Sequence, residues 1–398
     1  MLTHTEALHI IINSATPLNA ENCVLDCALN RFLARDILSR VTLPQYASAF
    51  KDGFAVRALE VARASAEHPI KLRVHGASFA GSAYQKEAPP ELTACKITTG
   101  AYLPLGFDTV IPWEDSFEED GHIIVVKAPR AGQEVIAAGT ELKEGEPLLR
   151  QGLGLKPADI GLAAAAGHSE LPVTRAPRVG IISTGNELVL PGRPLDAGQI
   201  YSSNQFQLKT QIKGMGMSAP AVIIPDDFNA TRQGVLGMLA GCDALISSGG
   251  SADSEKDFMG RVLQELGWEL LAEKIDIKPG HTLRYGKLQN KPFFVLPGTP
   301  SGSEICFNIF VTPLLLKMAG AARPSQPVVF ARLRERLKGS PKNKSVAQAV
   351  LSFTQDGPVL TPVPKDCGRL KSIAHKNALV IVPKEGYEAG TIVEAIMV

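Results

Sequence analysis

The pattern of hydrophobic and polar positions divides this chain of 398 residues into parts with different periods. Residues 178–320 alternate short apolar runs with stretches of helical spacing, which is typical of a mostly parallel sheet covered by helices. The apolar runs predict strands near residues 179–183, 221–224, 243–247 and 293–296. The helical spacing predicts helices near residues 203–214, 229–240, 256–266 and 302–318. We therefore expect a doubly wound α/β domain here.

The segments on either side of this part follow other patterns. Residues 3–14 predict a helix, because Thr3 and Glu6 can form a capping box ahead of an apolar face. Residues 24–38 read as an amphipathic or extended stretch, and the alanine-rich residues 157–166 predict a second helix. Short β-like runs separated by Gly, Pro and acidic turns are found at residues 71–75, 109–112 and 122–126.

The chain returns to a strand pattern after Arg323-Pro324. Strands are predicted there at residues 327–337, 346–354, 377–382 and 391–397. We expect an α/β multidomain protein built from five consecutive segments. They are an N-terminal helix and linker segment (1–45), a β-rich domain (46–146), a returning linker segment (147–177), the doubly wound domain (178–322) and a C-terminal β domain or barrel (323–398).

Composition excludes several classes of protein. The 45% apolar and 20% charged residues are ordinary for a globular protein, and the net charge of +1 argues against nucleic-acid and membrane partners. The one basic run is interpreted as a solvated strand face and turn, and it consists of Arg332, Arg334, Arg336, Lys338, Lys342 and Lys344. The chain has no signal-peptide pattern, no apolar run of eighteen residues and no CxxC pair among its six cysteines. We expect reduced cysteines and a cytoplasmic protein.

Three glycine-containing loops each follow a predicted strand directly. The ends of parallel strands meet at one edge of a sheet, where helix N-termini leave backbone N–H groups free to bind an anion. The candidate ligand-binding residues are Thr184, Gly185 and Asn186 in the first loop, Ser248, Gly249, Gly250 and Ser251 in the second, and Pro297, Gly298, Thr299 and Pro300 in the third. We expect them to hold a phosphorylated ligand.

Carboxylates follow the same predicted strand ends. Glu187, Asp226 and Asp257 would supply the oxygen ligands that Mg²⁺ prefers, together with the phosphate of the ligand. Each also has a simpler interpretation. Glu187 could be an ordinary loop carboxylate, Asp226-Asp227 could cap a helix, and Asp257 could lie in a first helical turn.

Three further charged residues carry two interpretations each. Lys274 and Lys278 precede Pro279-Gly280, and they would either neutralise an anionic ligand or be solvated. Asp52 stands beside Gly53, either in the turn of a hairpin or as a functional carboxylate. No Walker loop, nucleophile elbow or Ser/His/Asp set is present.

In their order, these motifs resemble the molybdopterin molybdenumtransferase family, the group of MoeA and the gephyrin E-domain, nearly from end to end. The matching stretches are Lys51–Val56, Thr98–Ala101, Ser183–Leu188, Gly198–Asn204, Asp226-Asp227, Ser247–Gly250, Lys278–Gly280 and Leu296–Pro300. The resemblance implies a homodimer of four-domain subunits, in which a MogA-like doubly wound domain and an elongated linker domain accompany the β-rich and barrel-like domains.

The same resemblance implies the reaction and the residues that carry it. Family members insert molybdate into adenylylated molybdopterin and release AMP with Mg²⁺, and contacts with the adenylyltransferase and with molybdoenzyme maturation proteins follow from that role. The β-rich domain, from the partner subunit, completes the cleft. By resemblance the catalytic positions are Asp52, Thr99, Glu141, Glu187, Asp226, Asp257, Lys274 and Lys278, with Glu187, Asp226 and Asp257 as metal ligands.

Several cleft loops depart from the family pattern. Ile136 stands where the family has a cation, Glu141 replaces an aspartate, and Asp253 adds a negative charge to the second glycine loop. A carboxylate near a bound phosphate repels it. An alternative is therefore a non-catalytic relative that binds molybdopterin or a nucleotide, or acts as a scaffold, and a weaker one is a transferase for another anion. The retained carboxylates and lysines favour the molybdenum transferase.

Overall fold

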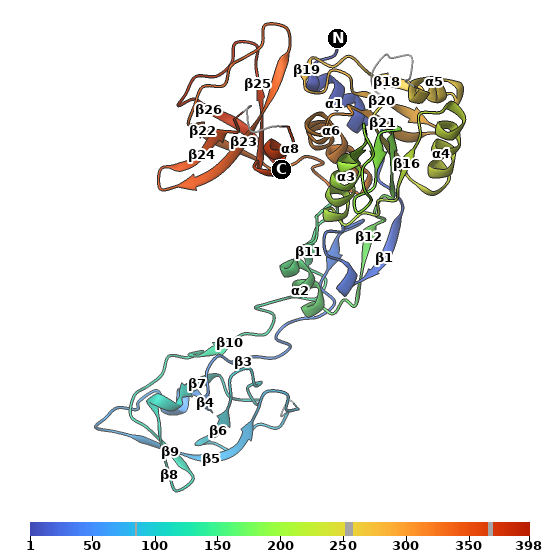
Figure 1. The fold of residues 1–398 in the computed structure, drawn as a ribbon. Helices are drawn as coiled ribbons and strands as arrows, with labels where there is room; N and C mark the ends of the chain where they lie inside the picture. The colour runs from blue at the N-terminus through green and yellow to red at the C-terminus, as the bar shows by residue number, and fades with distance from the viewer. Residues whose placement is uncertain (84–85, 251–257, 365–368) are drawn as a thin grey trace. The chain divides into compact units, whose positions relative to one another are not determined.

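The computed structural model describes residues 1–83, 86–250, 258–364 and 369–398. The chain forms two compact units with a mixed α/β fold (Figure 1). The larger unit contains Met1–Arg35, Arg150–Pro157 and Glu170–Val398, and the β-rich unit contains Asp36–Leu149 and Ala158–Ser169. Among the described residues, no helix combines the length and the apolar character needed to cross a membrane.

A six-stranded sheet lies at the centre of the larger unit. In order across the sheet, its strands are β16 (Ala221–Ile224), β13 (Val179–Thr184), β17 (Ala244–Ser248), β21 (Lys291–Leu296), β20 (Arg284–Leu288) and β18 (Glu269–Ala272). The first four are parallel to one another, and β20 is antiparallel to both of its neighbours. The four predicted strands are confirmed, whereas β18 and β20 were not predicted from the sequence.

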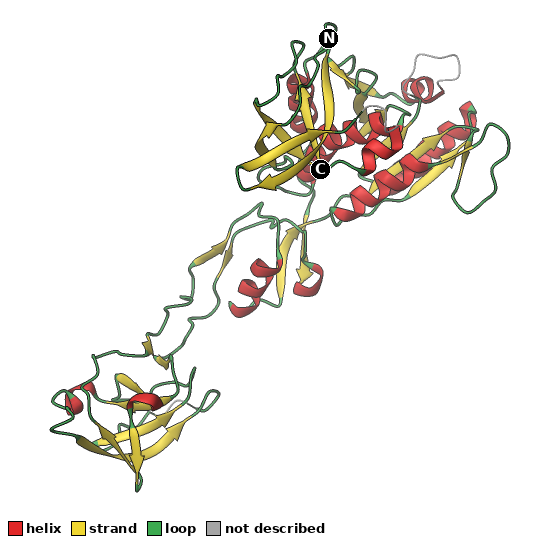
Figure 2. Cartoon of the chain, turned by 60° about the vertical axis from the view of Figure 1, so that its left-hand side comes forward, coloured by secondary structure: helices red, strands yellow, loops and turns green. Residues whose placement is uncertain are grey.

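Helices cover both faces of this sheet (Figure 2). Ile181 and Ile246 face a core shared with α1 (His4–Asn13), α3 (Ser203–Gly214), α6 (Pro300–Cys306) and α7 (Thr312–Met318). Ile182 and Leu245 are their neighbours in sequence and lie on the opposite face of the sheet. They pack against α4 (Phe228–Gly241) and α5 (Phe258–Glu265). Because successive strand residues point to opposite faces, continuous apolar runs produce this doubly wound arrangement.

Two helix predictions have different outcomes. The capping box is confirmed, since the Glu6 amide donates to Thr3 Oγ1 at 3.2 Å and the Thr3 amide donates to Glu6 Oε2 at 2.8 Å. The single helix predicted at residues 302–318 is instead α6, a π-helical segment over Phe307–Val311, and α7. Pro313 provides a physical reason, because proline has no N–H to donate and its ring crowds the carbonyl four residues earlier.

The C-terminal strands close into a five-stranded barrel. They are β22 (Val328–Leu333), β23 (Lys344–Thr354), β24 (Gly357–Pro362), β25 (Ala378–Val382) and β26 (Ile392–Met397), drawn in orange to red in Figure 1. The ring of pairs runs β23-β24-β22-β26-β25 and returns to β23. The short β19 (Ile277–Lys278) pairs in parallel with β23 and so joins the barrel to the α/β part. Helix α8 (Arg369–Ala374) precedes β25.

Shorter pairs complete the larger unit. Strand β1 (Ala20–Val24) pairs antiparallel with β12 (Glu170–Thr174), and β14 (Leu188–Val189) pairs in parallel with β15 (Ile200–Tyr201). The stretch 24–38 forms no long element, because only a 3₁₀ turn at Leu25–Cys27 and β2 (Ile37–Leu38) fall within it.

The β-rich unit is built on a second six-stranded sheet. In order, its strands are β7 (Thr109–Pro112), β4 (Gly53–Val56), β6 (Thr93–Ile97), β5 (Ile70–Ser78), β9 (His122–Val125) and β8 (Phe117–Glu119). The three predicted β-runs correspond to β5, β7 and β9. This unit also contains two small pairs, β2 with β11 (Pro147–Leu149) and β3 (Ser48–Ala49) with β10 (Val135–Ile136). Helix α2 (Pro157–Ala165) and two 3₁₀ helices, at Ala58–Val61 and Trp113–Asp115, complete its described elements.

Asp243 anchors the start of β17 to the end of β12. Arg175 donates two hydrogen bonds to its carboxylate, at 2.9 and 2.6 Å, and the Arg178 amide donates a third at 2.8 Å. Partial burial alone would raise the pKa of the Asp243 carboxyl, but these hydrogen bonds outweigh it, so the pKa lies below its ordinary value of 3.8. The ionised carboxylate therefore contributes its full stabilisation of the fold at pH values above the ordinary pKa of 3.8. This contribution is lost as the pH falls through the lower pKa of the folded protein.

Asp243→Asn is expected to lower the free energy of unfolding by about 1–2 kcal/mol at about pH 7, because the charge-assisted bonds to Arg175 are weakened in a partly exposed site. Urea unfolding followed by circular dichroism measures the difference. The gap between variant and wild type should shrink below the ordinary pKa of 3.8. A gap that stays constant with pH would show that the carboxylate charge contributes nothing.

Candidate functional site

The carboxyl ends of the parallel strands finish level with one another. Ser183 of β13 lies opposite Ser248 of β17, and Ser248 lies opposite Leu296 of β21. The three glycine loops that follow therefore meet, and residues of all three line one cavity of about 120 Å³. The lining from the loops consists of Ser183, Thr184, Glu187, Ser248, Gly249, Gly298 and Pro300. The convergence expected from the parallel-strand pattern is present in the structure.

Asn204, which sequence reasoning did not select as a site residue, links two of these loops. Its Nδ2 donates to Ser248 Oγ at 2.9 Å and to the Gly298 carbonyl at 2.8 Å. Its Oδ1 is buried and has no hydrogen-bond donor within the described residues. Asn204 belongs to the first turn of α3, whose residues Ser202 and Ser203 also line the cavity. A Ser-Ser-Asn triplet at a predicted helix start was the available signal.

Two carboxylates lie beside the first loop. The Asn186 amide donates to Asp226 Oδ2 at 3.4 Å, and the Asp226 amide donates to Asn186 Oδ1 at 3.1 Å. Gly185 has a φ of +152°, and a Cβ there would lie 2.5 Å from a Glu187 carboxylate oxygen. Only glycine lets the Glu187 side chain fold back over the loop. Asp227 caps α4 by accepting from the Ala230 amide at 2.8 Å, so the capping interpretation applies to Asp227 and leaves Asp226 beside the loop.

The described residues set a limit on the predicted metal site. Among them, no three His, Cys, Asp or Glu side chains are grouped so that they could hold a metal ion. Asp257 and Ser251, like Asp253, lie outside the described residues. Mg²⁺ keeps several waters and often uses one or two carboxylates together with substrate phosphates, so Glu187 and Asp226 stay candidate ligands. They do not form a closed protein cage.

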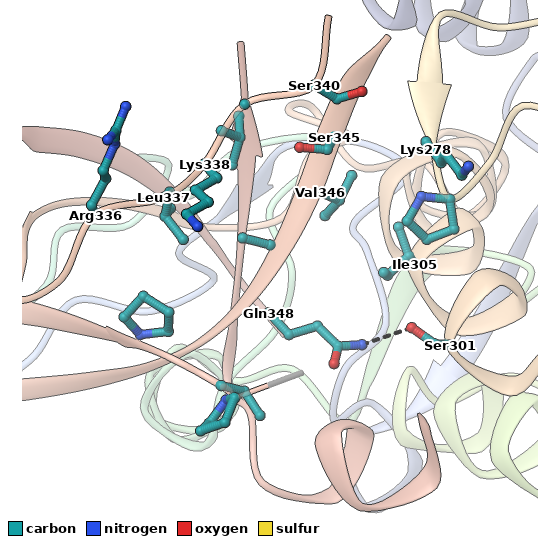
Figure 3. A pocket seen from close by; sticks show the side chains of 17 residues that line it. Lys278, Ser301, Ile305, Arg336, Leu337, Lys338, Ser340, Ser345, Val346 and Gln348 are labelled. Carbon is teal, nitrogen blue, oxygen red and sulfur yellow. Dashed lines mark hydrogen bonds between the residues drawn. The ribbon is translucent and has the colours of Figure 1, made fainter. Parts of the chain in front are cut away.

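A larger cavity of about 770 Å³ lies between the α/β part and the barrel (Figure 3). Lys278, Ser301 and Ile305 line it from the α/β side, and the barrel contributes Arg336, Lys338, Ser340, Ser345 and Gln348. None of the described residues that line it is acidic. Arg336 points away from the other labelled side chains in Figure 3 and pairs with Glu388 at 3.2 Å. The net positive lining suits a small oxyanion.

The two predicted lysines, Lys274 and Lys278, lie in different surroundings in the structure. Lys278 lines the larger cavity, and neither it nor Lys338 has a carboxylate within ion-pair distance in the part of the chain that is described. The Lys274 side chain is 72% exposed, lies 3.8 Å from Glu273 and lines neither cavity. The interpretation of the basic run as a solvated face fits Arg332, Arg334 and Lys338, which are all exposed, and Lys338 also lines the larger cavity.

The two cavities meet at the start of α6. Pro300 lines the smaller one and Ser301, the next residue, lines the larger. Thr299 is the N-cap position, and its carbonyl accepts from the Ser303 amide at 2.9 Å. Gln348 of β23 donates through Nε2 to Ser301 Oγ at 3.0 Å, the contact dashed in Figure 3. The first turn of α6 is therefore a wall that both cavities share.

Three predicted site residues belong to the β-rich unit. Thr99 donates to Asp52 Oδ1 twice, from its amide at 2.6 Å and from Oγ1 at 2.8 Å. Both residues are exposed, and Glu141 is exposed in a turn where its amide donates to the Leu43 carbonyl. The hairpin interpretation of Asp52-Gly53 is wrong, because Gly53 begins strand β4. A Cβ at Gly53 would lie 2.1 Å from the Ile111 carbonyl oxygen, so close strand approach requires glycine there.

Comparison with known proteins covers nearly the whole chain. Family models match the MoeA N-terminal region (domain I and II) at residues 2–167, a probable molybdopterin binding domain at 180–317 and the MoeA C-terminal region (domain IV) at 331–398. The molybdopterin molybdenumtransferase of Haemophilus influenzae is 34% identical over 319 residues, which are 80% of this chain and 77% of the relative. That of Synechococcus elongatus is 32% identical over 405 residues, 99% of each chain. A crystal structure of the molybdopterin biosynthesis MoeA protein from Pyrococcus horikosii is 29% identical and superposes with a TM-score of 0.85, over 100% of this chain and 99% of that one.

Thr99→Val is expected to raise the pKa of Asp52 toward its ordinary value of 3.8 without reaching it. The Thr99 amide and hydroxyl bonds hold this pKa low, in that order of size, and the substitution removes only the hydroxyl. A pH titration of the Asp52 carboxyl by NMR measures the shift. Thr98→Val is the matched control, because the Thr98 hydroxyl accepts from the Ala80 amide instead. An unchanged pKa in Thr99→Val would mean that the hydroxyl does not support the carboxylate.

Proposed function

This chain belongs to the molybdopterin molybdenumtransferase family, and we propose that it inserts molybdate into adenylylated molybdopterin with release of AMP. The observation that carries the proposal is the pair of cavities that share the first turn of α6. One is lined by hydroxyl groups and glycine loops, and the other by lysines without acidic residues among the described lining. Two anions of different kinds can thus be held next to each other.

The smaller cavity holds a phosphate of the adenylylated substrate in this proposal. Its 120 Å³ corresponds to about four water molecules, which is enough for a phosphate group but not for a whole nucleotide. The N-termini of α3 and α6 present their free N–H groups and positive dipole ends at this place. Ser248 adds a side-chain donor, because its hydroxyl accepts from Asn204 and keeps its own hydrogen free. The remainder of the substrate extends outward from the cavity.

Molybdate occupies the larger cavity. Lys278 and Lys338 neutralise its two charges, and the hydroxyls of Ser301 and Ser345 donate to its oxygens. Held there, the oxyanion lies beside the substrate anchored across the α6 wall. Transfer then proceeds by positioning and by neutralising charge, without a nucleophilic side chain.

Mg²⁺ is the proposed cofactor, held by Glu187 and Asp226 and by Asp257 outside the described residues. When bound, it would supply a positive charge that offsets the negative charge of the phosphate. The two carboxylates orient it, and the Asn186 amide fixes Asp226.

Glu187→Gln should weaken the dependence of AMP affinity on Mg²⁺ by about fivefold or more, because half of the described carboxylate charge is removed. Calorimetric titration of AMP with and without Mg²⁺ measures it, and an unchanged Mg²⁺ dependence would exclude Glu187 as a ligand.

The remaining parts of the proposal rest on the family resemblance. We propose a homodimer in which Asp52, Thr99 and Glu141 of one subunit act on the ligand bound by the other, with the five segments of the sequence analysis as its domains. A cytoplasmic location agrees with the five free cysteines of the described residues. The adenylyltransferase that makes the substrate and the molybdoenzyme maturation proteins that use the product are the proposed partners.

Analytical ultracentrifugation tests the proposed dimer. A monomer at micromolar concentration would contradict it.

The reaction is tested with the purified full chain, adenylylated molybdopterin, molybdate and Mg²⁺. AMP release and molybdenum bound to the product are measured together. The proposal requires both, and each must depend on molybdate. Binding of the substrate without AMP release would instead indicate a non-catalytic binding protein, and no binding would exclude both.

Lys278→Met should raise the KM for molybdate by roughly tenfold, as expected when one charge-assisted hydrogen bond is lost in a partly exposed site. The KM for adenylylated molybdopterin should change little, because Lys278 does not line the smaller cavity. Lys213→Met is the matched control, since this exposed lysine in the last turn of α3 lines neither cavity. Equal effects of the two substitutions would contradict a local role for Lys278.

A further inference from the structure

A buried ion pair joins helix α6 to the barrel domain. Lys376, between α8 and β25, donates to Glu304 Oε1 of α6 at 2.6 Å, and the two side chains are 4% and 2% exposed. Asn308 donates to the same carboxylate and also to the Glu304 carbonyl at 3.0 Å. Glu304 Oε2 has no donor within the described residues. Burial raises the pKa of Glu304, and Lys376 opposes that shift.

Stability does not explain such a pair well. Two charges lose their hydration when they are buried, and the attraction between them often only repays that loss. Apolar residues of the same volume are commonly as stable or more stable, so the best-attested role of a buried polar contact is to select one arrangement among several.

What the pair positions is the larger cavity. The walls of that cavity come from two bodies, with Ser301 and Ile305 on α6 and Lys338 and Gln348 on the barrel. Apolar contacts between these bodies, such as those of Leu379 and Val346 with the main core, are not directional and tolerate sliding. Glu304 lies one turn after Pro300 and Ser301, and directional contact with Lys376 fixes that turn relative to the barrel.

We propose that the Glu304–Lys376 pair is a positioning device that holds α6 and the barrel at the spacing at which the larger cavity binds molybdate. The inference rests on the proposed function. Glu304 and Lys376 line neither cavity, so they act through Ser301 and Gln348 rather than on the ligand. The pairing of β19 with β23 and the Asn343–Asp276 hydrogen bond hold the barrel on the Ile277–Lys278 side of the cavity. On the α6 side, the Ser301–Gln348 hydrogen bond is another directional contact beside the Glu304–Lys376 pair.

The test replaces both charges at once, as Glu304→Leu with Lys376→Met, so that no buried charge is left unpaired. Asn308 keeps its bond to the Glu304 carbonyl in this variant. The variant should remain as resistant to thermal unfolding as the wild type, while calorimetry with sodium molybdate shows binding weakened by roughly tenfold, the loss that follows when about one charge-assisted hydrogen bond is misplaced. Hydrogen exchange should quicken at residues 300–306 and 344–349.

The matched control is Arg232→Met with Glu265→Leu. This pair at 3.0 Å joins α4 to α5 on the surface, where the side chains are 43% and 50% exposed. Molybdate binding should be unchanged in it. Wild-type molybdate affinity in the folded Glu304/Lys376 variant would overturn the proposal and leave the pair a merely structural contact.

Lys376→Arg decides the matter if the double variant does not fold. It keeps the charge pair but places a wider head group in a site shaped for an ammonium, so α6 and the barrel should separate slightly and molybdate should bind more weakly. A folded Lys376→Arg protein with wild-type affinity would equally overturn the proposal. Failure of the proposed function is recognised separately, because the wild-type protein would then bind no molybdate at all.

Discussion

The level ending of strands β13, β17 and β21 is the constraint on which the rest of the site depends. Parallel pairing places Ser183, Ser248 and Leu296 side by side, so the loops that follow them lie next to one another. The third loop leads directly into α6, whose first turn is therefore fixed by the same register. Because that turn also forms a wall of the larger cavity, the sheet sets the position of both cavities.

Much of this could be predicted from the sequence, because it follows from local patterns. Continuous apolar runs predicted the four parallel strands, and a capping box predicted the start of α1. The meeting of the glycine loops followed from the rule that parallel strands end at one edge. Strand β20 was missed because Arg284, Gly286 and Lys287 interrupt its apolar residues, and β18 was missed because its apolar run Leu270–Ala272 is only three residues long. Both pair with antiparallel neighbours in the sheet. The π-helical interruption after α6 was missed because helical spacing continues through it.

Residues of the site that depend on distant contacts could not be predicted. Asn204 reaches loops 44 and 94 residues further along the chain, and nothing near it in sequence specifies those partners. Lys274 and Lys278 look alike as a spaced pair, yet only Lys278 belongs to a strand that joins the barrel. Lys338 lies in a basic run whose composition suggests a solvated face. Gly53 looks like a turn residue, and its need for glycine arises from Ile111 on a neighbouring strand.

The two cavities also differ in the charge of the residues around them, and this difference suits them to different ligands. Glu187 lines the smaller cavity and Asp226 lies beside its first loop, so a phosphate there meets negative charge as well as helix dipoles. The Mg²⁺ proposed for this site would offset that repulsion, and phosphate binding would then depend on the metal. The larger cavity has lysines and no acidic residue among its described lining, so an oxyanion can enter it without a metal. Under the proposed function, a divalent cation would thus be required for the nucleotide-bearing substrate and dispensable for molybdate. The shared wall at Pro300–Ser301 separates these two electrostatic environments and would keep the two proposed ligands next to each other.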